Sequence, residues 1–330
     1  MTDLRPMRLG ELIDRSASFW RGHWRSLFWL AVGFQLAQFI LVKTNQLVSS
    51  RFLPAMSGEL PTLLKDDPAT ALRQVGVGTA LFMVVALATL FVSQVGGVAT
   101  TFFVYPRLLG REGPTLRAAL EQAVRRLGVT LGAFLLSMAW TAVVGLGLVV
   151  PGGALAAAGV VLAERGSRAP GAVLLVLGSI ALTLGFVALM LWFLIRFLLT
   201  AQVVALEDAG PLKVFRRTDA LSSGRIAPGV GGVVKLRLMV LITVIGALLV
   251  VVSLVASFPS LALGFAYGAT LEPGHTVNDV VPQLILVPVE LVEVALSSLF
   301  APLYVVFQVF FYVDMRVRRE GLDLELKLAA

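Results

Sequence analysis

Six long apolar runs divide this sequence and decide what it can fold into. A helix needs about 20 apolar residues to cross the roughly 30 Å hydrocarbon core of a bilayer. The runs cover residues 27–47, 77–105, 129–150, 172–199, 233–257 and 284–313. Only 14% of the residues are charged, against about 25% in a soluble domain. The sequence therefore predicts an all-α membrane protein with six transmembrane helices, forming a single integral membrane domain over residues 1–330.

The third run ends less cleanly than the others. It stops at Pro151, which is followed by Gly152 and Gly153, and apolar residues resume over 154–163. That second stretch is too short to cross a bilayer. We expect either a bent extension of the third helix or a re-entrant segment.

The basic residues indicate which way the helices run. Twenty Lys and Arg lie in the N-terminal segment, the segments after the second and fourth runs and the C-terminal tail, whereas five lie in the other connections. Cytoplasmic loops carry the excess of Lys and Arg. We therefore expect a multi-pass protein of the bacterial inner membrane with both termini in the cytoplasm.

A basic, amphipathic segment precedes the first, third and fifth runs. In the first of these segments Trp20 and Trp24 share the apolar face, where they would serve as interfacial anchors. Each basic segment is followed by two apolar runs, which would form a transmembrane hairpin. This pattern suggests three repeated units, at 1–106, 107–206 and 207–313, followed by a tail at 314–330. The alternative is that the bias toward basic cytoplasmic loops alone produces this pattern.

Six stretches of the sequence are similar to one bacterial family. They are residues 5–15 (RPMRLGELIDR) with 19–24 (FWRGHW), 150–152 (VPG), 205–217 (ALEDAGPLKVFRR) with 223–225 (SGR), and 312–325 (YVDMRVRREGLDLE). This pattern resembles the membrane domain attached to some glycerophosphoryl diester phosphodiesterases, a family with many stand-alone members. The resemblance implies a helical membrane domain used as an anchor or a partner. Phosphodiesterase activity in the fused members belongs to a separate soluble barrel. Since this chain ends about 17 residues after its last apolar run, we expect a stand-alone member without the catalytic domain.

No catalytic constellation can be assembled from the sequence. Under the expected orientation His23 and His275 lie on opposite sides of the membrane, so they cannot share a metal ion or a proton. No glycine-rich loop ends in Gly-Lys-Ser/Thr. We therefore expect no enzyme activity, no cofactor and no metal site.

Ionisable and amide side chains near the membrane are candidates for a polar site. Glu290 and Glu293 share one face of the last helix and form either its solvated start or a cation or proton site. Arg196 either snorkels to lipid phosphates or pairs with an acidic residue. The acidic candidates are Glu207, Asp208 and Asp314. Gln94, in the second run, needs a partner helix.

Small residues at four-residue spacing predict close helix packing. They are Ser93, Gly97 and Thr101 in the second run, and Gly128 and Gly132 before and within the third. The expected cytoplasmic face also carries a dense basic cluster that would dock a partner or anionic lipid. Its members are Arg216, Arg217, Arg316, Arg318 and Arg319. The net charge of +7 belongs to loops against the membrane and does not indicate nucleic acid.

Two functions are consistent with the sequence. A solute path usually needs polar groups near the midplane of the membrane, and the polar residues weighed above lie near the boundaries. The sequence therefore favours a non-catalytic scaffold, anchor or subunit that recruits a partner at the cytoplasmic face. Its partners would be anionic lipids of the inner leaflet, another protein or further copies of the chain. The alternative is a transporter or channel for a small solute or ion, with a path between the hairpins.

Overall fold

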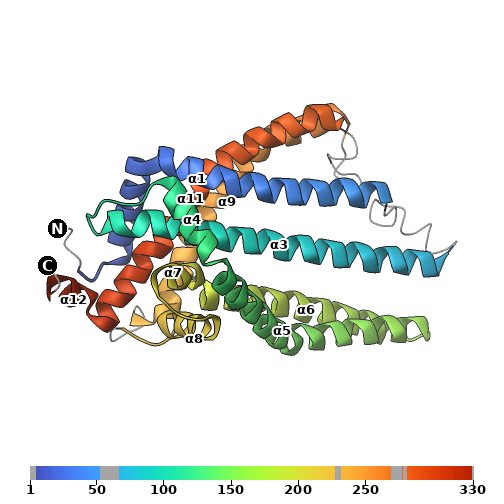
Figure 1. Cartoon of the computed structure of the whole chain (residues 1–330). Helices are drawn as coiled ribbons and strands as arrows, with labels where there is room; N and C mark the ends of the chain where they lie inside the picture. Colours follow the sequence, from blue (N-terminus) through green and yellow to red (C-terminus); the bar gives the residue numbers. More distant parts are fainter. Residues whose placement is uncertain (1–4, 53–66, 227–231, 269–276, 278–280, 329–330) are drawn as a thin grey trace. The chain divides into compact units, whose positions relative to one another are not determined.

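The computed structural model describes residues 5–52, 67–226, 232–268, 277 and 281–328, and within these residues the regular structure is helical, apart from one isolated β-bridge. The long helices are α1 (Leu9–Phe52), α3 (Pro68–Leu108), α5 (Leu127–Glu164), α6 (Arg168–Phe197), α9 (Val234–Ala266) and α11 (Gln283–Glu320). The short helices are α4 (Leu116–Arg125), α7 (Thr200–Leu206), α8 (Pro211–Ser222) and α12 (Leu322–Leu328) (Figure 1).

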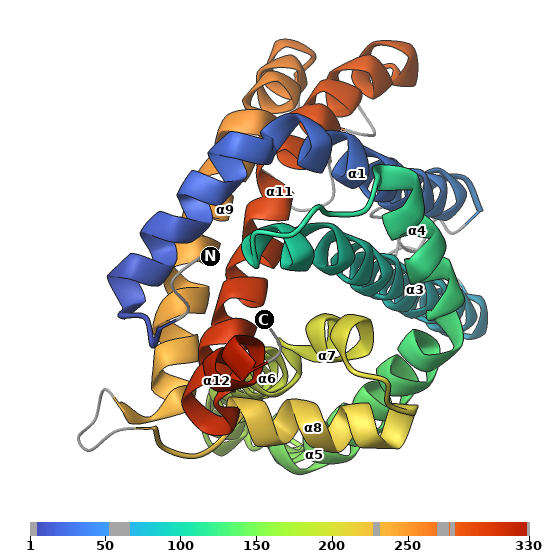
Figure 2. The same cartoon turned by 60° about the vertical axis from the view of Figure 1, so that its left-hand side comes forward.

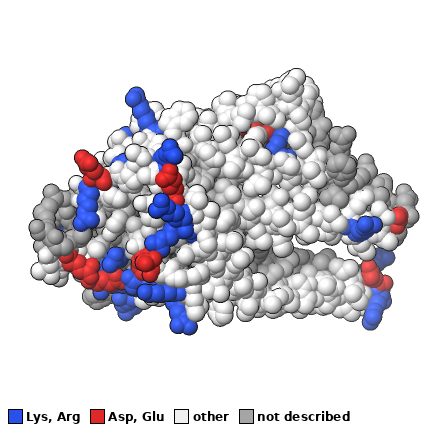
Figure 3. All heavy atoms as spheres, viewed as in Figure 1, with Lys and Arg blue, Asp and Glu red and all other residues white. Residues whose placement is uncertain are grey.

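Six of these helices are long and apolar enough to cross a membrane. The surface over them is apolar: Phe82, Leu184 and Val255 are all more than 60% exposed, as lipid-facing side chains must be. On the face drawn in Figure 3, charged residues gather toward the helix ends and leave the surface between them almost uncharged. The prediction of an all-α, multi-pass membrane protein with six spanning helices is confirmed.

Residues 154–163 continue α5 rather than turning back into the membrane. The helix runs through Pro151 to Glu164 and then, after a short turn, gives way to α6. Of the two expected arrangements the extension is therefore the one observed, and the re-entrant segment is wrong. Proline costs the helix one hydrogen bond, and the close packing of α6 against this part of α5 holds the helix together.

The α5–α6 hairpin packs backbone against backbone. A Cβ added at Gly171 would lie 2.7 Å from Ala163 N, and one at Gly178 would lie 2.6 Å from Ala156 Cα. Only glycine permits this approach. Close-packed positions recur at intervals of seven residues on both helices: Gly152 and Gly159 on α5, and Gly171, Gly178 and Gly185 on α6. The hairpin is therefore closed by a glycine face on each helix.

The chain divides into two compact units. Unit 1 consists of residues 1–125 and 241–314, and unit 2 consists of residues 126–240 and 315–330. Unit 1 thus contains α1, α3, α4 and most of α9 and α11, whereas unit 2 contains α5 to α8 and α12. These boundaries do not follow the three copies expected from the sequence, and the repeat stays a prediction.

The amphipathic segment expected before the first span is part of α1 itself. This helix has 44 residues and is about 66 Å long at 1.5 Å per residue, roughly twice the hydrocarbon thickness. Its first turns therefore lie outside the spanning part, and Figure 2 shows that α1 changes direction along its length. The start of α1 is fixed within unit 1, because Met7 N donates a hydrogen bond of 2.8 Å to Asp314 Oδ1. The other two amphipathic segments form separate helices, α4 and α8.

Candidate functional site: a polar cavity in unit 1

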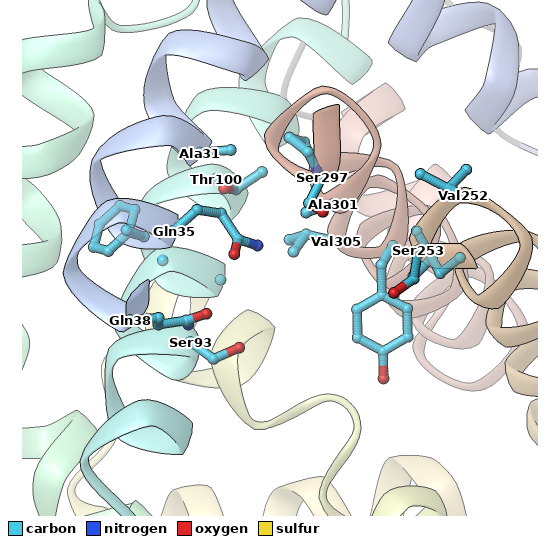
Figure 4. A pocket seen from close by; sticks show the side chains of 16 residues that line it. Ala31, Gln35, Gln38, Ser93, Thr100, Val252, Ser253, Ser297, Ala301 and Val305 are labelled. Atoms are coloured by element: carbon cyan, nitrogen blue, oxygen red, sulfur yellow. The ribbon is translucent and has the colours of Figure 1, made fainter. Parts of the chain in front are cut away.

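A cavity of about 250 Å³ lies among four spanning helices of unit 1. Polar side chains from all four helices line it: Gln35 and Gln38 from α1, Ser93 and Thr100 from α3, Ser253 from α9, and Ser297 and Tyr304 from α11. Figure 4 shows the amide of Gln35 and the hydroxyl of Ser253 reaching into the space between the helices. In hydrocarbon, polar side chains turn toward the interior of a bundle or toward water, so the sequence itself directs these groups inward.

The cavity lies near the middle of the apolar runs. Gln38, Ser93 and Ser297 each fall close to the centre of their run. Polar groups of unit 1 therefore lie well inside the apolar runs, and the prediction that they lie near the membrane boundaries is wrong for this unit. Hydropathy averaged over a run hides isolated amides and hydroxyls, and only the amide pair Gln35 and Gln38 within an apolar run could have revealed the site.

An ion pair lies on the same helices, nearer to the end of unit 1 at which α1 ends and α11 begins. We call this the distal end. Lys43 Nζ is 2.8 Å from each carboxylate oxygen of Glu290, and the two side chains are 7% and 16% exposed. Glu293 accepts a hydrogen bond from Ser260 Oγ of α9. The sequence indicated both glutamates, but it did not indicate that Lys43 pairs with one of them.

Gln94 is half-buried on α3 and does not line the cavity, although its neighbour Ser93 does. Gly97 is also a lining residue, and Thr101 is buried with its hydroxyl donating to Gly97 O at 2.7 Å. The expected stripe of small residues on α3 therefore faces a cavity over part of its length.

The two glycines expected to pack closely, Gly128 and Gly132 of α5, differ in their packing contacts. A Cβ at Gly132 would lie 2.6 Å from the Pro211 side chain of α8, so this glycine does permit close packing. A Cβ at Gly128 would meet no described atom within 4 Å. The prediction of a packing contact at Gly128 is therefore wrong for the described part of the chain.

In unit 2 the expected basic cluster is largely occupied by internal partners. Arg217 contacts Glu207 at 2.9 Å and also pairs with Glu320. Burial alone would lower the pKa of Arg217, but hydrogen bonds to these two carboxylates raise it above its ordinary value. Arg217 is therefore a fixed cation that joins α8 to the end of α11.

The remaining members of the cluster divide into bound and exposed side chains. Arg316 lies 2.9 Å from Glu320, and Arg319 donates to the carbonyl oxygens of Ala220 and Ser223. Those carbonyls lie at the C-terminal end of α8, where a positive charge is favourable. Arg318 is half-buried and Arg216 is exposed. Most of this charge therefore stabilises unit 2.

Arg196 of α6 pairs with Asp219 of α8 at 3.2 Å, a partner that the sequence analysis did not consider. Its guanidinium is also within 6 Å of four ring centroids, at distances from 5.2 to 5.8 Å. The rings belong to Trp140, Trp192, Phe197 and Phe215. Aromatic rings attract cations through their faces, so Arg196 is held in place from several sides.

The two tryptophans of α1 lie in different surroundings. Trp20 is half-buried and donates from Nε1 to Leu299 O at 3.0 Å, whereas Trp24 is 43% exposed. Their role as interfacial anchors stays a prediction. Trp24 has the exposure that this role needs.

The fold and the cavity define a multi-pass helical membrane protein with polar groups gathered between spanning helices. Among the described residues, no group of three His, Asp or Glu side chains could hold a metal ion. No family model matches the sequence, and neither curated proteins nor solved structures give a match. The resemblance to the phosphodiesterase membrane domain therefore stays a prediction.

Proposed function

We propose that this protein is a transporter or channel for a small polar solute, which it binds in the cavity of unit 1. It would lie in the bacterial inner membrane with both termini in the cytoplasm and would carry out no enzymatic chemistry. This choice departs from the scaffold function that the sequence favours. The observation that supports it is the convergence of polar side chains from four spanning helices on one cavity.

The cavity has the features of a solute site inside a membrane. Polar residues within spanning segments commonly mark substrate or ion pathways, and transporter sites commonly lie near the midplane between helices. At about 250 Å³ the cavity is smaller than the roughly 300–1,000 Å³ of drug-sized pockets. The solute would therefore be small, and amide and hydroxyl groups would contact it.

The absence of cysteine from the sequence makes a direct test simple. A Ser297→Cys variant in intact cells is treated with a membrane-impermeant thiol reagent, and a Leu296→Cys variant is the matched control. Ser297 lines the cavity, whereas Leu296, one residue away, is 39% exposed on the apolar surface. Only a thiol that water reaches can ionise and react.

We expect modification at position 297 and none at position 296. Unreactive thiols at both positions would contradict a water-accessible cavity and with it the proposed function. In a second measurement, Gln35→Leu should abolish uptake of the solute in cells, while leaving the amount of protein in the membrane unchanged. The same uptake in the variant and the wild type would also contradict the proposal.

A scaffold at the cytoplasmic face is the second candidate. The specific observation in its favour is the exposure of Lys213 and Arg216 on α8, two cations outside the internal ion pairs described above. Reversing both charges, with Lys213→Glu and Arg216→Glu, should disrupt docking of an acidic partner and leave unit 2 folded. A Gln35→Leu variant would keep its cellular role under the scaffold function and lose it under the solute function.

A further inference from the structure

We propose that the ligand of this site carries an ammonium group, and that it enters along a polar track leading from the cavity to the distal end of unit 1. This inference rests on the proposed solute function and specifies the chemistry of its ligand. The track, the charge around it and its hydrogen-bonding groups each support it.

The track follows from residue spacing on all four helices. On α9, Ser253 of the cavity lies seven residues, or two turns, from Ser260. On α11, Ser297 lies four residues from Glu293 and seven from Glu290. Residues at these intervals share one face of a helix, and the contact between Ser260 and Glu293 joins the two faces.

The other two helices continue the same pattern toward the distal end. On α1, Gln38 lies seven residues from Asn45, and on α3, Ser93 lies four residues from Thr89. The two helices meet here, because Gln38 Nε2 donates to Thr89 O at 3.4 Å. Polar side chains therefore continue along the cavity-facing side of each of these helices for one to two turns beyond the cavity.

The charge at the distal part of the track is negative. Lys43 and Glu290 neutralise each other as an ion pair. Glu293 contacts the neutral hydroxyl of Ser260, and no cation pairs with it among the described residues. One carboxylate therefore remains to attract a cation.

The track contains hydrogen-bond acceptors that lack a donor. Among the described residues, Asn45 Oδ1 and Thr89 Oγ1 are buried and have no hydrogen-bond partner. An ammonium group carries only donors, so it complements acceptor oxygens of this kind as well as the Glu293 carboxylate. The rings of Phe34 and Tyr304 line the cavity beyond them and would attract the same charge through their faces.

An ammonium group could come from a free small amine or from the headgroup of an aminophospholipid. Both sources present the same donors and the same single charge. The experiment therefore tests first whether the site attracts an ammonium group. It tests second whether that group belongs to a free amine or to a lipid headgroup.

The test compares two thiol reagents at Ser297→Cys in reconstituted vesicles of phosphatidylglycerol. One is a methanethiosulfonate with a trimethylammonium group, and the other carries a sulfonate; each rate is divided by the rate with a free thiol in water. We expect the cation to react at least about tenfold faster than the anion. In a Glu293→Gln background the ratio should fall well below the wild-type ratio, since only the contribution of the phosphatidylglycerol surface then remains, whereas Glu293→Asp should preserve the wild-type ratio.

The matched control for the charge change is Glu164→Gln, which removes an exposed carboxylate at the end of α5 in unit 2 and should leave the ratio unchanged. Equal rates for both reagents would overturn the ammonium proposal and leave the solute cavity standing. An absence of reaction with either reagent would overturn both. If Glu293→Gln does not fold, the ammonium proposal is tested by the ratio of the two reagent rates in the wild-type background and by protection with ethanolamine.

The source is identified by protection. Ethanolamine added to phosphatidylglycerol vesicles should slow modification at position 297 if a free amine occupies the site. Modification that is slower in vesicles containing phosphatidylethanolamine, without added amine, would identify the headgroup. A reaction that is slowed by neither would overturn the ammonium proposal.

Discussion

Lys43 of α1 and Glu290 of α11 form an ion pair in which Nζ lies 2.8 Å from both carboxylate oxygens. The pair joins the first and last spanning helices of unit 1, and both side chains are mostly buried. A buried pair of this kind contributes little over an apolar contact, but breaking it leaves a charge without a partner. Its two residues are therefore coupled in a measurable way.

The first prediction concerns this coupling. Lys43→Met should lower the free energy of unfolding by about 3 kcal/mol, because Glu290 then remains buried without its cation. The double variant Lys43→Met, Glu290→Leu should recover at least half of that loss. Thermal unfolding of the purified variants in detergent measures both the loss of stability in the single variant and its recovery in the double variant. A single variant as stable as the wild type would mean that the pair does not form.

The second prediction tests the glycine faces of the α5–α6 hairpin. Gly178→Ala should destabilise the protein by about 1–3 kcal/mol, since its Cβ would collide with the backbone at Ala156. Gly147→Ala on α5 is the control, because a Cβ there meets no described atom within 4 Å. The control should be neutral or stabilising by up to about 1 kcal/mol. Similar melting temperatures for the two variants would contradict the packing.

The third prediction concerns pH and the start of α3. Asp67 caps this helix by accepting from Thr70 N at 3.1 Å and from the Thr70 hydroxyl, and these bonds hold the pKa of Asp67 below its ordinary value. A depressed pKa means that the cap stabilises the helix fully above the unfolded-state pKa and loses its effect as the pH falls through the folded-state pKa. Amide exchange over residues 69–72, corrected for the intrinsic effect of pH, should accelerate on acidification.

Asp67→Asn provides the comparison, because asparagine caps a helix about equally well and does not titrate in this range. In that variant the exchange rates, corrected for the intrinsic effect of pH, should stay constant. An identical pH response in both proteins would exclude Asp67 as its source.

The fourth prediction concerns orientation. Reporter fusions at Asp67 and at Gly274, which is outside the described residues, should behave as external. Fusions at Gly113 and Gly224 should behave as internal, as the excess of Lys and Arg predicts. Reversal at any of these positions would contradict cytoplasmic termini.

The sequence predicted the spanning helices well because their length and apolar character are local properties. It did not predict which helices contact each other, since lipid-facing and helix-facing side chains are equally apolar. Gln35 and Gln38 were missed because two amides hardly change the hydropathy of a run. The basic cluster was counted by its arginines alone, and the acidic partners Glu207 and Glu320 became evident only in the folded chain.

The glycine faces of α5 and α6 were missed for a different reason. Small residues were sought at four-residue spacing, whereas these glycines recur every seven residues, with Gly171 and Gly178 as an example. Over two turns a seven-residue spacing returns to nearly the same face of the helix. The pattern was readable in the sequence, but it is weaker against a background rich in glycine and alanine.

The backbone contact between α5 and α6 has a consequence for the order of assembly in the cell. The two helices are consecutive in the chain and joined by a short turn, so they can pair as soon as residue 197 has left the ribosome. They would then leave the translocon together as a helical hairpin, before the last two spanning helices are inserted. A truncated chain ending after α6 should already be integrated into the bilayer and resist extraction at alkaline pH.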